Sequence, residues 1–285
     1  IIGRYSLWWH NTPPYNDHRV GVIGHYAVSD GSAARQVLQH ACEELAANGC
    51  TLAVGPMDGN TWRRYRLVSE FGSEPTFFLE PNNPEDWPGH FVENGFEPLA
   101  EYFSALDTDL SYEDPRMNSV ADRMTAAGIL IRSLDPQHFE DDLRCIYAVA
   151  KVGFRNHILY SEIAEAEFIS EYQVFQHFVR HDLVLIAERH TEPVGFIFAV
   201  PDLLQAKRGD TIDTLIVKTL GVLPGRDYAG LGHLLLERVG STAFQLGYTR
   251  LIHALVRDVG HLRKMSRESA RPIRRYTLFA KELRS

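Results

Sequence analysis

Three closely spaced glycines, Gly225, Gly230 and Gly232, are the residues whose spacing points most directly to chemistry. They follow an apolar strand pattern over 214–223 and lead into an amphipathic helix pattern. Glycine lets backbone N–H groups approach an anion closely, and a helix N-terminus adds partial positive charge. The segment therefore predicts a phosphate-bearing, nucleotide-like cofactor near residues 226–233.

Two common phosphate-binding motifs do not fit this loop. The P-loop requires a lysine followed by Ser or Thr after its last glycine, whereas His233 and Leu234 follow Gly232. The dinucleotide-binding fingerprint requires a further Gly or Ala three residues on, where Leu235 stands. The alternative at this level is a glycine-rich turn that binds nothing.

The segment Leu220–Leu236 resembles the cofactor loop of the GNAT superfamily of N-acetyltransferases. In that family, a loop of the form Arg/Gln-x-x-Gly-x-Gly/Ala holds the pyrophosphate of acetyl-coenzyme A, mainly through backbone amides. Gly230 and Gly232 match the two small positions, and the arginine lies one residue before the basic position. The cofactor site that this resemblance implies consists of Val222, Leu223, Arg226, Asp227, Tyr228, Ala229, Gly230, Leu231, Gly232 and His233.

Acetyl transfer, which the resemblance implies, needs a held thioester, a polarised carbonyl, a base for the amine and an acid for the thiolate. The carbonyl would accept a backbone N–H from Leu220–Leu223. Lys218 interrupts the apolar strand, so it must reach a partner or a cavity. We expect it to line the acceptor pocket and to bind an acceptor carboxylate rather than serve as the base. The alternative is a strand-end lysine that extends to solvent.

The general acid has no clear candidate. Many GNAT enzymes use a tyrosine after the fifth strand, but residues 258–270 contain none. His261, Ser266 and Tyr276 are the nearest candidates, and Tyr276 also fits a core position in a strand. This pattern is consistent with a reaction that lacks a dedicated acid, or with a domain that binds but does not react.

Other side chains suggest binding less specifically. His177 and His181 lie four residues apart at a predicted helix end, but no third ligand is evident and no metal site is predicted. The basic run over 63–66 would bind an acidic ligand or form ion pairs on a solvated face. Three arginines near the C-terminus are candidates to reach the 3′-phosphate of coenzyme A: Arg271, Arg274 and Arg275.

The composition is that of a globular protein, with 285 residues, of which 45% are hydrophobic and 23% charged. A formal charge of −8 argues against a nucleic-acid partner. Three widely spaced cysteines indicate a reducing, cytoplasmic compartment and no zinc cluster. No membrane span or signal peptide is visible, and the start at Ile1 suggests that the chain begins inside a longer protein.

An internal repeat appears when the chain is shifted by 198 residues, which places Ala34 on Gly232 and Gly49 on Gly247. Each copy reads strand, turn, amphipathic helix, glycine, strand. The predicted elements are strand 20–28, helix 32–48 and strand 50–55 in the first copy, and strand 214–223, helix 230–246 and strand 250–256 in the second.

The first copy differs where the cofactor would bind. Asp30 or Ser32 is expected to cap its helix, and a carboxylate at that place would repel a pyrophosphate. We therefore expect only the second copy to bind acetyl-coenzyme A. The Gly95-Phe96 step resembles the ending of GNAT domains, and a strand over Leu99–Leu106 is expected to close the first copy.

The second copy is preceded by the other elements that the GNAT fold requires. They are a strand over 128–134, helices over 137–152 and 169–180, and hairpin strands over 183–188 and 194–200, with a short helix near 261–269 and a strand over 273–283 at the end. We predict an α/β (α+β) protein of two GNAT-like domains, with a central mixed β-sheet flanked by helices. Residues 1–110 form an incomplete, degenerate domain, 111–127 a linker, and 128–285 a complete domain.

The function that best fits these features is N-acetyl transfer from acetyl-coenzyme A to an amine of a small molecule or peptide, by a monomer or homodimer. A non-catalytic module or scaffold that binds an acyl-coenzyme A is the alternative. A third possibility, aminoacyl transfer from charged tRNA, is disfavoured by the acidic balance, and no membrane partner is predicted. Acceptor pockets in this fold are built from variable loops, so the motifs above do not specify the acceptor.

Overall fold

The computed structural model describes residues 2–259 and 270–283, and its strands form one mixed sheet. In spatial order the strands are β1 (Gly3–Trp8), β2 (Val20–Val28), β3 (Leu52–Gly55), β11 (Arg271–Glu282), β5 (Glu97–Asp107), β10 (Arg250–Arg257), β9 (Thr214–Val222), β8 (Glu192–Pro201), β7 (Val184–Arg189) and β6 (Ile129–Ser133), with β4 (Leu67–Glu70) beside β11. The pairs β2–β3 and β9–β10 are parallel, whereas β8–β9 and β5–β11, for example, are antiparallel.

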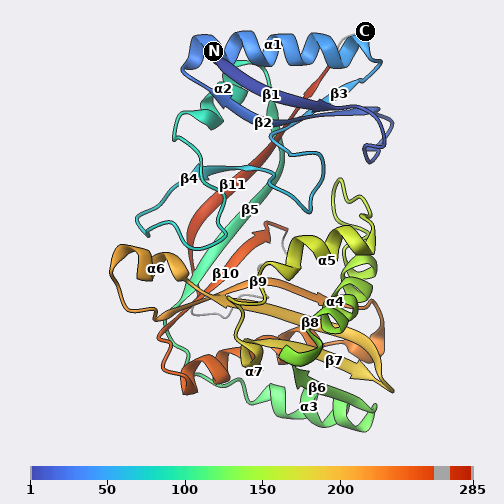
Figure 1. The fold of residues 1–285 in the computed structure, drawn as a ribbon, viewed down its shortest axis with the longest axis vertical. Helices are drawn as coiled ribbons and strands as arrows, with labels where there is room; N and C mark the ends of the chain where they lie inside the picture. The colour runs from blue at the N-terminus through green and yellow to red at the C-terminus, as the bar shows by residue number, and fades with distance from the viewer. Residues whose placement is uncertain (1, 260–269, 284–285) are drawn as a thin grey trace.

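Helices flank both ends of this sheet (Figure 1). The longer helices are α1 (Gly31–Ala47), α2 (Trp87–Glu93), α3 (Arg116–Ala126), α4 (Phe139–Gly153), α5 (Glu165–Gln173) and α7 (Leu231–Gln245). Shorter turns are α6 (Leu203–Arg208), η1 (Pro136–His138), η2 (His181–Leu183) and η3 (Arg226–Tyr228). Within the described ranges, no helix has both the length and the apolar character needed to cross a bilayer.

The strands of the second half are buried on both faces. In β7, Val184 and Ile186 pack in the core beneath α4 and α5, whereas Leu185 and Ala187 pack in the core beneath α7. Successive side chains of a strand point to opposite faces, so a strand between two helical layers must be apolar throughout. The continuous apolar runs of the sequence follow from this two-sided burial, and the predicted α/β architecture with a helix-flanked mixed sheet is confirmed.

The same β-α-β unit occurs twice, as the 198-residue repeat predicts. Parallel β2 and β3 are joined by α1, and parallel β9 and β10 are joined by α7. The Asp30 carboxylate caps α1 by accepting the Ala33 N–H at 3.0 Å. Gly49 and Gly247 follow the two helices with φ of +78° and +87°, the left-handed conformation expected there.

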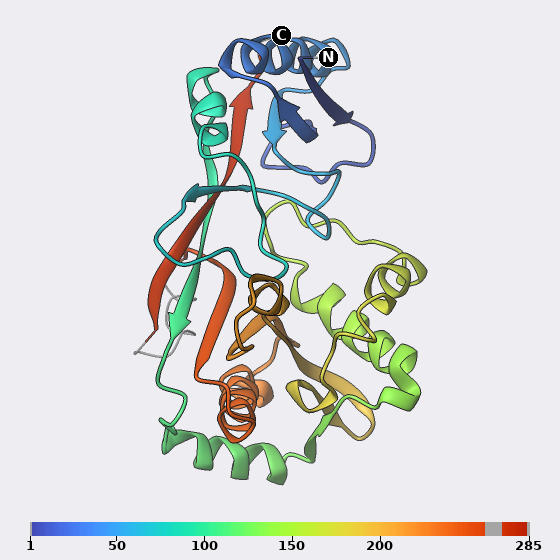
Figure 2. The ribbon, with the colours of Figure 1, turned by 60° about the vertical axis from the view of Figure 1, so that its left-hand side comes forward.

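The last strand of each half pairs with the other half. The strand over Leu99–Leu106 was expected to close the first copy, but β5 lies between β10 and β11. In return β11 pairs with β3, so it completes the sheet of the first half. Figures 1 and 2 show β5 and β11 running side by side along the length of the molecule. This continuous sheet crosses the predicted boundaries at 110 and 128, and the division into two domains stays a prediction.

One helix is displaced from its predicted position. The pattern over 169–180 predicted a helix, but α5 spans Glu165–Gln173. Phe168 and Ile169 are buried and place the helix, whereas Val174 and Phe178 are 62% and 50% exposed and lie beyond its end. The predicted helix end was too late because two exposed apolar residues continued the helical periodicity beyond the last buried turn. The helix predicted near 261–269 lies outside the described residues.

Candidate functional site

The parallel strands β9 and β10 separate in the middle of the sheet. They pair from Thr214 opposite Arg250 to Val217 opposite His253, and both then continue without pairing to each other. On the other side of β9, the register with β8 slips between Val217 and Thr219, so Lys218 is an extra, bulged residue. A bulge bends its strand. The two strands therefore open into a V at the position of Lys218.

A cavity of about 770 Å³ fills this opening. One wall is formed by residues 217–222 of β9 and another by residues 253–257 of β10. Helix α4 also contributes residues to the lining. The roof comes from the first half, through residues 61–66 and 79–81. Both halves of the chain therefore build the same cavity.

The glycine-rich loop lies at the end of β9. Gly225 and Gly230 have φ of +155° and +88°, and Gly230 directly precedes the first residue of α7. The first helical hydrogen bond runs from Leu234 N to Gly230 O at 3.0 Å, and no side chain caps this end. The amides of Leu231 and Gly232 precede that bond, so they lack an acceptor within the helix. An anion at this end would receive backbone N–H donors and the favourable end of the helix dipole.

Arginines from outside the loop surround it. Arg189 forms an ion pair with Asp227 at 3.2 Å, so the loop's carboxylate is neutralised. Arg123 of α3 donates a hydrogen bond to the carbonyl of Ala229. A Cβ at Gly230 would lie 3.4 Å from Arg123 Nη2, so this guanidinium lies against the helix start. Sequence reasoning missed Arg123, because residues 111–127 carry no motif and were interpreted as a linker.

Lys218 lines the cavity, and its Nζ donates a hydrogen bond to the carbonyl of Leu79 at 3.2 Å. Burial, together with the nearby charge of Arg66, lowers the pKa of Lys218 from its usual 10.5 to about 7. A large fraction of this amine is therefore neutral at neutral pH. A neutral amine that already donates to Leu79 keeps a lone pair that can accept a proton.

Tyr276 lies elsewhere. Its side chain is fully buried, its hydroxyl contacts the Glu80 carboxylate and the Ser104 hydroxyl, and it is absent from the cavity lining. Burial and the neighbouring Glu80 carboxylate raise the pKa of Tyr276. The hydroxyl is thus placed to support the packing of β11 rather than to meet a substrate in the cavity.

The arginines of β11 are all engaged with acids. Arg271 pairs with Glu74, Arg274 with Glu80, and Arg275 with Glu70 and Asp258. The expected role of these arginines, to reach the 3′-phosphate of coenzyme A, stays a prediction, and a phosphate there would compete with these carboxylates. Each guanidinium is already neutralised by a carboxylate that the sequence pattern did not pair with it.

The remaining candidates fall outside the cavity or outside the described residues. His261 and Ser266 lie in 260–269, which the structure does not describe. His177 lies beyond the end of α5 and His181 begins η2, so their spacing is not that of one helix face. Within 2–259 and 270–283, no group of three or more His, Cys, Asp or Glu side chains is arranged to hold a metal ion.

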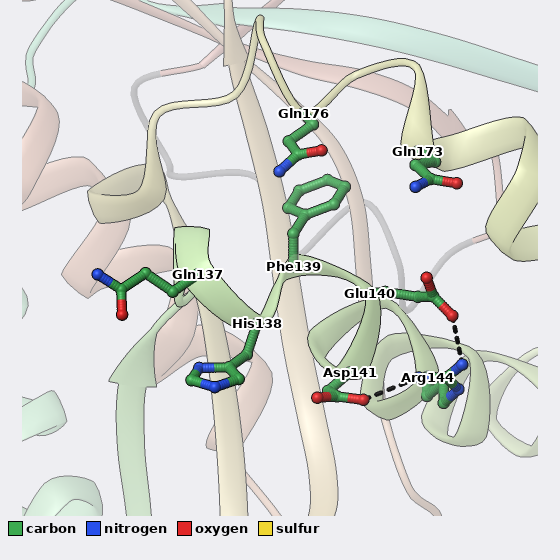
Figure 3. A pocket seen from close by; sticks show the side chains of 8 residues that line it. All are labelled: Gln137, His138, Phe139, Glu140, Asp141, Arg144, Gln173 and Gln176. Carbon is green, nitrogen blue, oxygen red and sulfur yellow. Dashed lines mark hydrogen bonds and ion pairs between the residues drawn. The ribbon is translucent and has the colours of Figure 1, made fainter.

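A second hollow of about 340 Å³ lies at the start of α4 (Figure 3). Figure 3 shows Arg144 turned toward Glu140 and Asp141, and the charges of the hollow are largely paired within it. These side chains are 45–68% exposed, so water screens them strongly. The residues that line this hollow belong to no strand of the sheet, and the cavity between β9 and β10 is the stronger candidate.

The roof segment is anchored on β2 at Gly24. Met57 N donates to Ile23 O at 2.8 Å, and His25 N donates to the Asp58 carboxylate at 2.6 Å. A Cβ at Gly24 would lie 2.1 Å from the carbonyl oxygen of Met57, which belongs to the backbone and cannot turn away. Only glycine permits this approach, and it fixes the start of the segment that leads to residues 61–66.

We expect Gly24→Ala to lower the free energy of unfolding by about 1–3 kcal/mol, because the added methyl must displace the Met57 backbone. Urea denaturation followed by circular dichroism measures this change. Gly31→Ala is the matched control, since its Cβ would lie 3.8 Å from the nearest atom, in His90. Equal effects of the two substitutions would show that the contact at Gly24 does not constrain the roof.

Comparisons with known proteins place this geometry in a fold family. No family model matches the chain. Protein YghO of Escherichia coli K12 is 22% identical over 189 residues, covering 64% of this chain and 48% of YghO, so the chain spans about half the length of this curated relative.

Solved structures resemble the chain over almost its whole length. A GCN5-related glucosamine N-acetyltransferase region of a fungal multi-domain GH3 β-N-acetylglucosaminidase covers 98% of this chain and 31% of its own, with a TM-score of 0.56 and 13% identity. A GCN5-related N-acetyltransferase from Sphaerobacter thermophilus covers 93% of this chain and 74% of its own, with a TM-score of 0.53 and 14% identity.

A tandem GNAT protein from the clavulanic acid biosynthesis pathway covers 100% of this chain and 80% of its own, with a TM-score of 0.50 and 11% identity. At these identities the likeness establishes the fold. The chain has the GNAT fold, and the resemblance inferred from the glycine-rich loop is confirmed at that level.

Proposed function

We propose that this protein transfers an acetyl group from acetyl-coenzyme A to an amine, and that the cavity between β9 and β10 holds the reacting groups. The observation that carries the proposal is the alignment of three features along β9. They are a helix start with free N–H groups, an opened strand edge, and a lysine with lowered pKa. Together they provide an anion site, a carbonyl site and a base.

The residues present fit the cofactor. The amides of Leu231 and Gly232 would hold the pyrophosphate at the start of α7, with Arg123 beside them. The Leu223 N–H donates to Val194 O at 2.9 Å, so the Val222 N–H, one residue earlier in the strand, points away from β8 toward the opened edge. Val222 is therefore the donor that would polarise a carbonyl in the cavity.

The base in this proposal is Lys218. Bound acetyl-coenzyme A supplies an activated acetyl group, whose carbon–sulfur bond breaks as the acceptor's nitrogen–carbon bond forms. Neutral Lys218 takes the proton that the nitrogen loses, and the resulting ammonium donates it to the departing sulfur. The carbonyl of Leu79 orients the lysine throughout. This role differs from the carboxylate binding expected from sequence alone, because a lysine with a pKa of about 7 is a poor fixed charge and a suitable base.

Turnover distinguishes the proposed enzyme from a binding module. Incubation with acetyl-coenzyme A and a library of amines is expected to release free thiol, measured with a chromogenic disulfide, together with one equivalent of N-acetylated product. Tight binding of acetyl-coenzyme A with no thiol release for any amine would favour the non-catalytic module instead.

Placing a carboxylate at the start of α7 tests the anion site. We expect Gly232→Asp to weaken acetyl-coenzyme A binding by about tenfold or more, because a negative charge would face the pyrophosphate. Isothermal titration calorimetry measures the affinity, and Gly232→Asn, of the same shape but neutral, is the control. If the Asp and Asn variants bind equally well, the charge of this helix end does not contribute to binding.

A further inference from the structure

Arg66 is a buried charge that the acetyl-transfer mechanism does not use. It lies in the roof of the cavity and is 8% exposed. Its guanidinium carbon lies 4.0 Å from the ring centroids of both Tyr65 and Tyr102. Contact with two aromatic rings holds the guanidinium in a fixed position. Arg66 is therefore a pre-positioned cation in the cavity roof.

Two of the three guanidinium nitrogens of Arg66 have no hydrogen-bond partner within the described part of the chain. The Nε and Nη1 atoms of Arg66 are buried and have no acceptor there. Arg274 is equally buried, at 5% exposed, but it donates to the Glu80 carboxylate and to the Glu74 carbonyl at 2.9 Å. A buried, unpaired guanidinium is costly unless an anion joins it. The difference between these two arginines suggests that the partner of Arg66 is a ligand.

Two other charged side chains around the cavity are paired, whereas Arg64 and Arg257, which also line it, are exposed and partly buried, respectively. Arg63 pairs with Glu167 at 2.9 Å and with Glu171 at 3.4 Å. Glu80, which reaches the cavity, is neutralised by Arg274. The cationic run over 63–66 therefore divides into a solvated ion pair at Arg63, an exposed cation at Arg64 and a buried, uncompensated charge at Arg66. The charge of Arg66 also contributes to the lowered pKa of Lys218.

We propose that Arg66 binds the carboxylate of the acceptor, so that the acceptor is an amine bearing a carboxylate, such as an amino acid. This assignment rests on the acetyl-transfer function proposed above. A carboxylate carries one charge and two acceptor oxygens, which suit one uncompensated guanidinium with several unsatisfied N–H groups. A phosphate would bring up to two charges, whereas Arg64, the neighbouring arginine of the roof, is exposed, so water screens it. Arg66 and Lys218 line the same cavity, so one ligand can present its carboxylate to the first and its amine to the second.

Matched acceptors test this assignment. The standard amino acids, their amides and their decarboxylated amines differ only at the group that Arg66 would bind. For the wild-type protein, we expect kcat/KM for the best amino acid to exceed that for its amide by about tenfold or more. Arg66→Met should raise KM for the amino acid by about tenfold or more, with little effect on KM for the amide or on acetyl-coenzyme A affinity.

Arg63→Met is the control, because it removes an exposed, already paired cation of the same run and should leave the preference unchanged. Thermal unfolding of each variant checks that it folds. Equal use of acids and amides by the wild-type protein, or equal loss of both in a folded Arg66→Met variant, would overturn the assignment.

A binding measurement separates this inference from the proposed transferase activity. If no amine releases thiol, thermal shifts with the same amino acids and amides still report on Arg66. Stabilisation by amino acids but not by amides, lost in Arg66→Met, would support the carboxylate site. The absence of thiol release would then count only against the proposed acetyl transfer. Absence of any such stabilisation in the wild-type protein, together with no preference in turnover, would refute the site.

Discussion

Lys218→Met is expected to lower kcat by about 10²–10⁴-fold, because it removes the group that we propose takes the amine's proton. In the wild-type protein, kcat should rise with pH and level off with an apparent pKa of about 7, the value to which burial lowers this lysine. The variant should lose that rise, while its affinity for acetyl-coenzyme A changes little. Thiol release at saturating acceptor between pH 5.5 and 9, a range chosen to bracket the shifted pKa, measures both effects.

The same substitution should stabilise the protein at neutral pH. The pKa of Lys218 is about 7 in the folded protein and about 10.5 when unfolded, so the unfolded chain binds more protons between these values. The contribution of Lys218 to stability therefore rises as the pH increases from 7 to 10.5, and its cost is largest at pH 7 and below. Lys218→Met should raise the unfolding temperature most near pH 7 and least near pH 10.5.

Lys207→Met provides the control for both measurements, because Lys207 is exposed on α6 and away from the cavity lining. It should change neither the pH dependence nor the unfolding temperature appreciably. A Lys218→Met variant that kept the wild-type rise near pH 7 would exclude Lys218 as the base.

Glu80→Gln is expected to cost about 3–5 kcal/mol of unfolding free energy, because it leaves the buried guanidinium of Arg274 without its counter-charge. The two side chains are 1% and 5% exposed, and Arg274 Nε lies 2.9 Å from the carboxylate. Burial raises the pKa of Glu80 even though Tyr276 and Arg274 act in the opposite direction. The network ties the segment that carries Leu79, and hence the partner of Lys218, to β11. Urea denaturation measures the loss.

Glu70→Gln makes the same chemical change in another partner of β11. Glu70 pairs with Arg275 at 3.3 Å, but its side chain is 69% exposed, so the loss should not exceed about 1 kcal/mol. The double variant Glu80→Gln with Arg274→Met should recover part of the loss, because it removes the unpaired charge. Similar losses for Glu80→Gln and Glu70→Gln would show that burial does not control the strength of this network.

Local sequence patterns were sufficient for the elements that depend on near neighbours. The apolar runs over 20–28 and 214–223, the helices that follow them and their terminal glycines were all predicted close to their observed positions. These features arise from strand alternation, helical periodicity and capping, which act over a few residues. The glycine-rich loop belongs to this class, because its conformation depends on Gly225, Gly230 and the start of α7.

The order of the strands was beyond the reach of such patterns. The local sequences of β5 and β11 are compatible with pairing to the strands of either half. They do not specify which strand each one pairs with. The structure places β5 against β10 and β11 against β3. Pairing partners distant in sequence are selected by packing on both faces of the completed sheet and by the crossing of the connecting segments.

The chemistry of the site divides in the same way. The sequence alone determined that Lys218 interrupts an apolar strand, that a glycine-rich loop follows it, and that a cationic run occupies 63–66. Only the tertiary structure decided that Lys218 meets Leu79, that Arg66 is buried without a partner while Arg63 is paired, and that Tyr276 is engaged by Glu80. Burial and charge pairing set the pKa and the role of each group. For Lys218, Arg63 and Tyr276, the partner residue lies more than a hundred positions away in the chain.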